Sequence, residues 1–224
     1  MNTKPFAILV PLLAAGCLMA EDVKVSDIRL EFGIMPNNFE ASSSTRVTSS
    51  SGTVTNSSSS NDKQNADSNW RGAVQLMFGN LASSGGFVYG GEVAVNYAKF
   101  SNGGTKTTQT SPVADIMLGY GFAPTKEWHF EVTPFAGIGV SFGDVSGDNQ
   151  VDANYDAVYT EYGLRAATYY TFESHWQVGL DLRYIAAQSN PEFDYTTTGN
   201  NSVHQEQDQS NHGFSGLIGV GRRF

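Results

Sequence analysis

Eight segments of the chain alternate between apolar residues and small or polar residues with a period of two. In the second segment, Trp70, Val74 and Leu76 share one parity, whereas Arg71 and Gln75 share the other. Alternation over roughly ten residues is typical of a β-strand with one apolar face. The pattern therefore predicts an all-β fold with strands at 27–35, 70–79, 87–98, 113–122, 128–142, 160–172, 176–186 and 213–224.

The connections between these segments alternate in length. The short ones lie at 79–86, 123–127 and 173–175, and the long ones at about 36–69, 99–112, 143–159 and 187–212. Short periplasmic turns that alternate with long external loops are typical of outer-membrane barrels, whose strand number is even. A soluble secreted β-sandwich would show the same alternation with its apolar face inward, and it is the alternative fold.

One group of aromatic residues favours the barrel. Its members share the apolar parity and lie at strand ends beside a short connection: Phe78, Phe87, Phe122, Trp128, Phe172 and Trp176. Rings in such places form a belt at a membrane interface, whereas a soluble core gives no reason to collect them at one end. The sequence therefore predicts an eight-stranded antiparallel up-and-down transmembrane β-barrel.

The opposite parity carries charged residues that this barrel would place in its lumen. They are Arg29, Glu31, Arg71, Glu92, Asp115, His129, Glu131, Glu161, Arg165, Asp181 and Arg183. An eight-stranded barrel is just wide enough for side chains to fill, and unpaired charges inside it would be costly. We therefore expect a structural network of ion pairs, with inward glycines such as Gly137 and Gly179 leaving room for long side chains.

Residues 1–20 have the features of a secretory signal peptide. Lys4 precedes an uncharged, mostly apolar run, and small residues stand where cleavage would occur. The run is shorter than the ~20 residues of a membrane-spanning helix, and Pro11 interrupts it. We expect a cleaved signal and one barrel domain over 21–224, with the cleavage point and lipidation of Cys17 left open.

The charge and hydropathy of the chain restrict its partners. The 224 residues carry a formal net charge of −9 and are 40% hydrophobic, with a mean hydropathy of −0.27. An acidic balance argues against nucleic acid, because nucleic-acid binding needs a basic surface. The moderate hydropathy is compatible with a barrel, because the alternating residues of barrel strands average to moderate polarity. Much of the excess negative charge falls in 143–159 and 187–212, which contain no Lys or Arg.

The signal, the eight strands, the alternating loop lengths and the terminal Phe224 resemble the small outer-membrane β-barrels of the OmpA, OmpX and opacity-protein kind. The resemblance covers 21–224. Segment 213–224 is similar to the terminal strand that the barrel-assembly machinery recognises, with Phe224 as the assembly signal, and it departs from that pattern at Arg222. The resemblance implies a place in the cell outer membrane, with outer-membrane lipid, lipopolysaccharide and that machinery as partners.

Two of the long loops have a biased composition. Loop 36–69 has eleven Ser among residues 37–69, too polar a composition to order itself by burial, so we expect a flexible external loop. Loop 143–159 contains Asp144, Asp148, Asp152 and Asp156. Clustered carboxylates suit calcium, but the Asp-x-Asp-x-Asp-Gly order of an EF-hand is absent, so we predict no metal site.

The four histidines are the candidates for catalysis. A lipid A-modifying membrane enzyme would need a Ser beside a His base on the membrane-facing side. His129 has the lumen parity, His175 lies in a short turn, and His204 and His212 lie in a polar loop. None has a Ser partner on the apolar face, and no phosphate-binding or dinucleotide-binding motif is present. We predict no catalytic residue, no cofactor and no enzyme activity.

These observations favour an integral outer-membrane β-barrel protein with a structural or surface-interaction, adhesion-like role. The sequence does not identify its external ligand. The alternative is a narrow porin-like channel for ions or small hydrophilic solutes, which planar-bilayer conductance would reveal. A lipid A-modifying enzyme is the less favoured third hypothesis, and mass analysis of lipid A would reveal it.

Deletion of Phe224 should lower the yield of folded protein in the membrane, because the terminal aromatic residue is part of the assembly signal. The measurement is the fraction of protein that migrates as a folded, heat-modifiable band in gels of isolated membranes. Phe224→Tyr, which keeps an aromatic terminus, is the control and should assemble normally. Equal yields from the deletion and the intact chain would contradict the assembly role.

Overall fold

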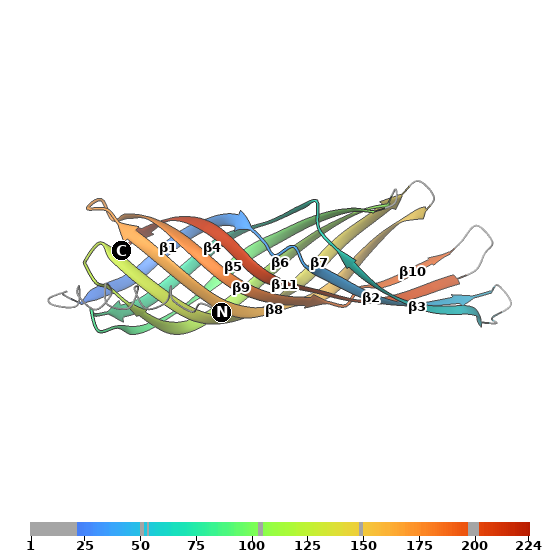
Figure 1. The fold of residues 1–224 in the computed structure, drawn as a ribbon, viewed down its shortest axis with the longest axis horizontal. Helices are drawn as coiled ribbons and strands as arrows, with labels where there is room; N and C mark the ends of the chain where they lie inside the picture. Colours follow the sequence, from blue (N-terminus) through green and yellow to red (C-terminus); the bar gives the residue numbers. More distant parts are fainter. Residues whose placement is uncertain (1–21, 50–51, 53, 103–104, 148–149, 197–201) are drawn as a thin grey trace, which may run out of the picture.

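The computed structural model describes residues 22–49, 52, 54–102, 105–147, 150–196 and 202–224 (Figure 1). The expected signal peptide, including Cys17, lies outside these residues. Eleven β-strands make up the regular structure of the described part, and they belong to one sheet. Among these residues, no helix is long and apolar enough to cross a membrane.

Eight of the strands close into a barrel. They are β1 (Val23–Ile34), β4 (Ser68–Leu81), β5 (Gly86–Asn102), β6 (Thr105–Phe122), β7 (Trp128–Gly147), β8 (Gln150–Thr171), β9 (Trp176–Ser189) and β11 (Ser202–Arg223). Each pairs antiparallel with the next in this order, and β11 pairs back onto β1 from Asp27↔Arg223 to Ile34↔Gly216. The eight-stranded antiparallel barrel is confirmed, and the two-sheet sandwich is wrong because one sheet closes on itself.

The other three strands extend the sheet beyond one end of the barrel. They are β2 (Phe39–Thr48), β3 (Val54–Gln64) and β10 (Glu192–Thr196). Strand β11 connects them to the barrel, because its residues 202–211 pair with β2 and its residues 202–206 pair with β10. Figure 1 shows β2, β3 and β10 projecting at the end opposite the C-terminus. We call this the hairpin end, and the opposite end the short-turn end.

The four long connections are largely β-hairpins, which corrects the expectation of a flexible loop at 36–69. Range 36–69 holds β2 and β3, and in the other three ranges the barrel strands continue to Asn102, Gly147 and Ser189. That flexibility was inferred from low apolar burial, but strand pairing orders β2 and β3. Ser43 faces Ser60 across the hairpin, with their Oγ atoms 2.8 Å apart.

The barrel is apolar on its outside. Large apolar side chains such as Leu30, Ile116 and Ile218 are exposed on the outward face, Ile116 by 75%. Soluble monomers rarely expose a contiguous apolar patch larger than a few hundred Å², about 300–600 Å² at most. The outward parity of every barrel strand contributes to this surface, so the barrel carries an apolar band around its whole circumference.

Aromatic rings border the apolar band at both ends. The six predicted belt residues all lie on the outward parity near the short-turn end, where Phe122 stacks on Phe130 with ring centroids 5.1 Å apart. A second group, which the sequence analysis did not identify, lies toward the hairpin end. There Trp70 stacks on Tyr97 with centroids 5.2 Å apart. The other members of this second group are Phe32, Tyr184 and Phe214.

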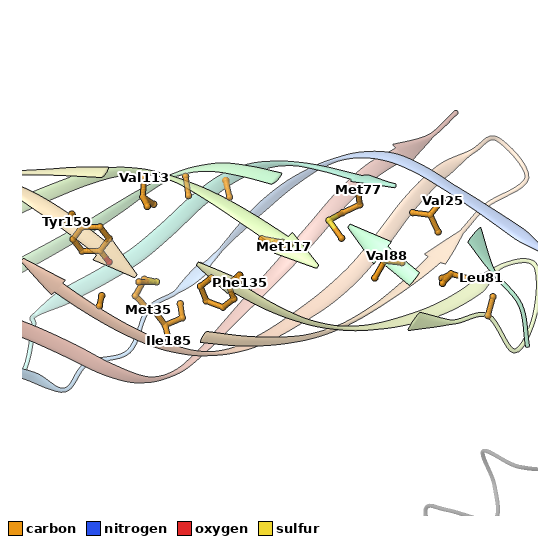
Figure 2. Close-up of a cluster of buried hydrophobic side chains, with 14 of the residues drawn as sticks. Val25, Met35, Met77, Leu81, Val88, Val113, Met117, Phe135, Tyr159 and Ile185 are labelled. Atoms are coloured by element: carbon orange, nitrogen blue, oxygen red, sulfur yellow. The ribbon is translucent and has the colours of Figure 1, made fainter. Parts of the chain in front are cut away.

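Apolar side chains also fill part of the barrel interior. Figure 2 shows Val25, Met77, Leu81 and Val88 grouped toward one end of the cluster. Leu81 belongs to the short-turn end, where the turn after it leads into β5. Another group, which includes Phe135, lies farther along the axis. The interior therefore combines apolar layers with the charged residues described below.

Leu180→Arg should destabilise the barrel. Leu180 faces outward on β9, halfway between Trp176 and Tyr184 in sequence, and an Arg at the bilayer midplane of a barrel costs about 2–4 kcal/mol. Urea unfolding of the protein in phospholipid bilayers would measure this loss. Ser58→Arg, at an exposed position on β3, is the control and should change stability by less than about 0.5 kcal/mol. Equal effects of the two changes would contradict a lipid-facing band.

Candidate functional site

Four arginine side chains occupy the barrel interior. Arg29, Arg71, Arg165 and Arg183 come from β1, β4, β8 and β9, and all four are fully buried. Their strands alternate inward and outward positions, so a residue on the inward parity has only the lumen to enter. Each guanidinium therefore needs carboxylate or carbonyl acceptors from other strands.

Arg29 bonds to both carboxylate oxygens of Glu131, at 2.9 and 2.7 Å. It also bonds to Asp27 at 2.8 Å and to Gln75 at 3.1 Å. Its guanidinium carbon lies 3.9 Å from the ring centroid of Tyr169. One arginine thus links strands β1, β4, β7 and β8 across the lumen.

Arg71 is the centre of a second group of carboxylates. It contacts Glu92 at 2.6 Å, Asp115 at 2.6 Å and Glu161 at 2.7 Å, and it donates to Asn96 Oδ1 at 2.8 Å. Three acidic side chains around one guanidinium hold strands β4, β5, β6 and β8 together. Among the described contacts, Arg71 is the arginine that pairs with both Asp115 and Glu161. These two carboxylates therefore depend on Arg71 for charge compensation.

Arg165 and Arg183 join these two groups into one network. Arg165 contacts Glu131 at 2.7 Å, and both arginines bond to Asp181. Arg183 bonds to both oxygens of Glu92 at 2.8 Å and also to Glu31. Arg29 shares Glu131 with Arg165, and Arg71 shares Glu92 with Arg183. The ion pairs of all four arginines are therefore connected in one network.

All eleven residues that the sequence analysis assigned to the lumen are buried inside the barrel. His129 is part of the same network, because its Nε2 lies 3.3 Å from Glu131 and 3.1 Å from Arg29, and its Nδ1 lies 3.0 Å from Arg223. These partners are one carboxylate and two guanidinium groups. His129 therefore joins strand β7 to β1 and to the end of β11 within the lumen.

The network also contains four uncharged residues, Asp27 and Arg223, none of which was among the predicted lumen residues. Gln75, Asn96, Tyr169, Gln177 and Asp27 all bond to charged residues within the lumen. Each has the inward parity of its strand, and that parity was the available signal. The four uncharged residues carry no charge to distinguish them, whereas Asp27 lies two residues before Arg29 and shares its parity.

The ring of Tyr169 shows why glycine is needed at two inward positions. Tyr169 is the register partner of Gly179, which in turn faces Gly219 on β11. A Cβ added at Gly179 would lie 2.2 Å from the ring, and one at Gly219 would lie 3.1 Å from it. The two glycines create the space in which Tyr169 lies beneath Arg29.

The other predicted features fall outside the lumen. Asp144 and Asp156 are exposed, whereas Asp148 and the side chain of Asp152 lie outside the described residues. Within the described ranges, no three His, Cys, Asp or Glu side chains are grouped so that they could hold a metal ion. Phe224 is exposed, its backbone N–H donates to Ser26 at 2.9 Å, and Arg222 lies over its ring.

Similarity to known proteins is found only among solved structures. No protein-family model matches the chain, and no curated protein matches its sequence. Among solved structures, Ail, the attachment invasion locus protein of Yersinia pestis, is 11% identical, with a TM-score of 0.33 over 84% of this chain and 98% of Ail. The outer membrane protease OmpT of Escherichia coli is 12% identical, with a TM-score of 0.39 over 88% of this chain and 97% of OmpT.

The outer membrane protein OprG of Pseudomonas aeruginosa is 14% identical, with a TM-score of 0.35 over 90% of this chain and 97% of OprG. The three proteins differ in role, since one is described as an attachment protein and another as a protease. The closed ring of eight antiparallel strands, described above from its own register, carries the fold assignment for this chain.

Arg71→Met should destabilise the barrel by about 3–5 kcal/mol, because removing one partner leaves buried carboxylates uncompensated. Unfolding by urea in bilayers would measure the loss. Arg46→Met, at an exposed position on β2, removes the same charge without burial and is the matched control. Adding Asp115→Asn and Glu161→Gln to Arg71→Met should restore part of the stability. A cost below 1 kcal/mol for Arg71→Met, or no recovery, would contradict the network's role.

Proposed function

We propose that the protein is an integral outer-membrane β-barrel with a structural or surface-interaction, adhesion-like role and no catalytic activity. The observation that carries this proposal is the inverted arrangement of side chains. The outside of a closed eight-stranded ring is apolar and bordered by aromatic rings, while its inside holds ion pairs. In water this arrangement would expose the apolar side chains, and in a bilayer it satisfies both faces.

The dimensions of the apolar band support a membrane. On β4, Trp70 and Phe78 are eight residues apart, and on β9, Trp176 and Tyr184 are also eight residues apart. Eight residues of strand span about 27 Å, which a tilt of about 40° reduces to ~20 Å along the barrel axis. A barrel's apolar band is about 25 Å tall between its aromatic girdles, and the bacterial outer membrane is thinner than average.

The orientation follows from the connections. Three short turns and both ends of the barrel domain lie at the short-turn end, which we assign to the periplasm. The extended hairpins then face the exterior, and the six predicted rings lie at the inner interface. Outer-membrane lipid surrounds the band, lipopolysaccharide surrounds the hairpin end, and the barrel-assembly machinery is the partner during insertion.

The filled lumen favours a surface role over a channel. Side chains of the network from opposite walls meet at hydrogen-bonding distance, as Arg29 does with Glu131 and Arg183 does with Glu92. These side chains have no exposed surface, so the network closes the barrel to ions and small solutes. The hairpins, by contrast, present an ordered sheet of β2, β3, β10 and β11 for contacts outside the cell.

Cysteine labelling on intact cells tests this proposal. Ser58→Cys on β3 should react with a membrane-impermeant maleimide, whereas Glu173→Cys in the turn before β9 should react only after the outer membrane is permeabilised. Both positions are exposed, so they form a matched pair. The purified protein should also show a folded, heat-modifiable band in gels and no conductance in planar bilayers.

Three outcomes would overturn the proposal. Recovery of the protein from periplasm as a detergent-free monomer would refute membrane insertion. Reversed labelling of the two cysteines would refute the orientation. Stepwise conductance of the intact protein, lost when the barrel is unfolded, would favour the channel over the surface role.

A further inference from the structure

Strand β3 at the hairpin end has one edge that no described strand covers. It pairs with β2 along one side, and on its other side the sheet ends. Its register with β2 is uninterrupted from Asn56 to Gln64, because the single irregularity lies nearer the tip, between Val47 and Thr48. The backbone N–H and C=O groups along the outer side of this regular stretch are therefore available to another strand.

The open edge is also accessible. Consecutive residues of a strand point to opposite faces, and Ser58, Ser59, Ser60 and Asn61 are all exposed. Both faces of this part of the hairpin therefore meet solvent. Strand β10 also has a single pairing partner, but it is five residues long and contacts β8, so β3 offers the longer edge.

The middle of β3 lacks the features that usually keep strand edges from pairing. Natural edge strands carry proline, lysine, bulges or inward-pointing charges that exclude a further strand. Segment 56–61 contains no proline and no charged residue. It has no apolar residue either, so a partner would be held by backbone hydrogen bonds and by short polar side chains rather than by apolar burial.

The sequence of this edge fits a second copy of itself. Residues 56–61 read Asn-Ser-Ser-Ser-Ser-Asn in either direction. When two copies pair antiparallel about the point between Ser58 and Ser59, each serine lies opposite a serine and each asparagine opposite an asparagine. The charged residues Asp62 and Lys63 then lie opposite uncharged positions, so no like charges oppose each other.

The symmetry of this pairing determines how the two molecules lie. A two-fold axis relates the copies, so that a residue i that faces j on one strand is matched by j facing i on the other. The two strands run in opposite directions, and β2 and β3 project along the long axis of the molecule, away from the short-turn end (Figure 1). The two barrels therefore lie at opposite ends of the joined sheet. Copies within one membrane point the same way, so the second copy has to stand in a facing membrane.

We propose that β3 is a self-recognition strand, whose open edge pairs antiparallel with β3 of a second copy on a facing cell. This proposal rests on the proposed function, because the hairpin end must face the exterior. A contact of six residues is weak by itself, but many copies on two facing surfaces act together and multiply its strength. The external ligand of the surface role is then the protein itself.

Disulfide crosslinking between proteoliposomes tests the register. The chain from residue 21 onward contains no cysteine, so Ser58→Cys and Ser59→Cys each introduce one thiol. Directly opposed residues have Cα atoms about 4.5–5.5 Å apart, which a disulfide can bridge. Phosphatidylcholine proteoliposomes of the two variants, mixed and oxidised with copper phenanthroline, should give covalent dimers. Either variant alone should give few, because the same position in the two copies points to opposite faces of the sheet.

The matched control for crosslinking is Ser44→Cys mixed with Ser59→Cys. Ser44 is exposed on β2, but β2 is paired on both sides, with β3 and β11. This mixture should give no covalent dimer above the level of the single variants.

Aggregation of proteoliposomes, followed by light scattering, tests the adhesion. The intact protein should aggregate them. Lysine at both Ser58 and Ser59, or glutamate at both, should slow aggregation at least about tenfold, because like charges then oppose each other at two places in every contact. Mixing the lysine and glutamate variants should restore it. Ser42→Lys with Ser44→Lys, on β2, is the control and should aggregate as the intact protein does.

Three results would overturn the proposal. These are dispersed proteoliposomes of the intact protein, crosslinking of a single variant as efficient as that of the mixture, and no recovery when the lysine and glutamate variants are mixed. Heat-modifiable mobility of every variant verifies that its barrel has folded. Labelling of Ser58→Cys on dispersed intact cells reports the orientation independently. Failure of self-recognition is therefore distinguishable from failure of the membrane proposal.

Discussion

The pairing of buried guanidinium and carboxylate groups across the lumen is the interaction on which the rest of the structure depends. The partners come from distant parts of the chain, for Arg29 is 102 residues from Glu131 and Arg183 is 152 residues from Glu31. A charge in this space is costly without its partner. The barrel must therefore be narrow enough for arginine and carboxylate side chains from opposite strands to reach each other.

An ionic interior changes what the outside of the barrel has to do. In a soluble protein the apolar side chains would form the core. Here the apolar side chains of each barrel strand face outward, away from the barrel interior. In the closed ring, every strand of the barrel wall is paired on both sides. A sheet in hydrocarbon requires this pairing, because lipid offers no hydrogen bonds to a free strand edge. Closure, an apolar exterior and a salt-bridged interior are thus consequences of one arrangement.

Parity along the strands was enough to predict the eight barrel strands and the eleven charged residues of the lumen. It was not enough to predict β2 and β3, whose serine-rich sequence has no apolar periodicity and is ordered by pairing with β11. Nor does parity show which residues meet. The contact of Tyr169 with Arg29 depends on register and on space at Gly179, and both are set by the closed barrel.

The length of β11 has a consequence for the order in which the molecule is completed. Its C-terminal part lies between β9 and β1, and its N-terminal part pairs with β2. Strand β11 is the last of the described strands, whereas β2 is the second. The β2–β3 hairpin can therefore join the barrel sheet only once β11 has been made. The hairpin end is thus completed by the same strand that closes the barrel.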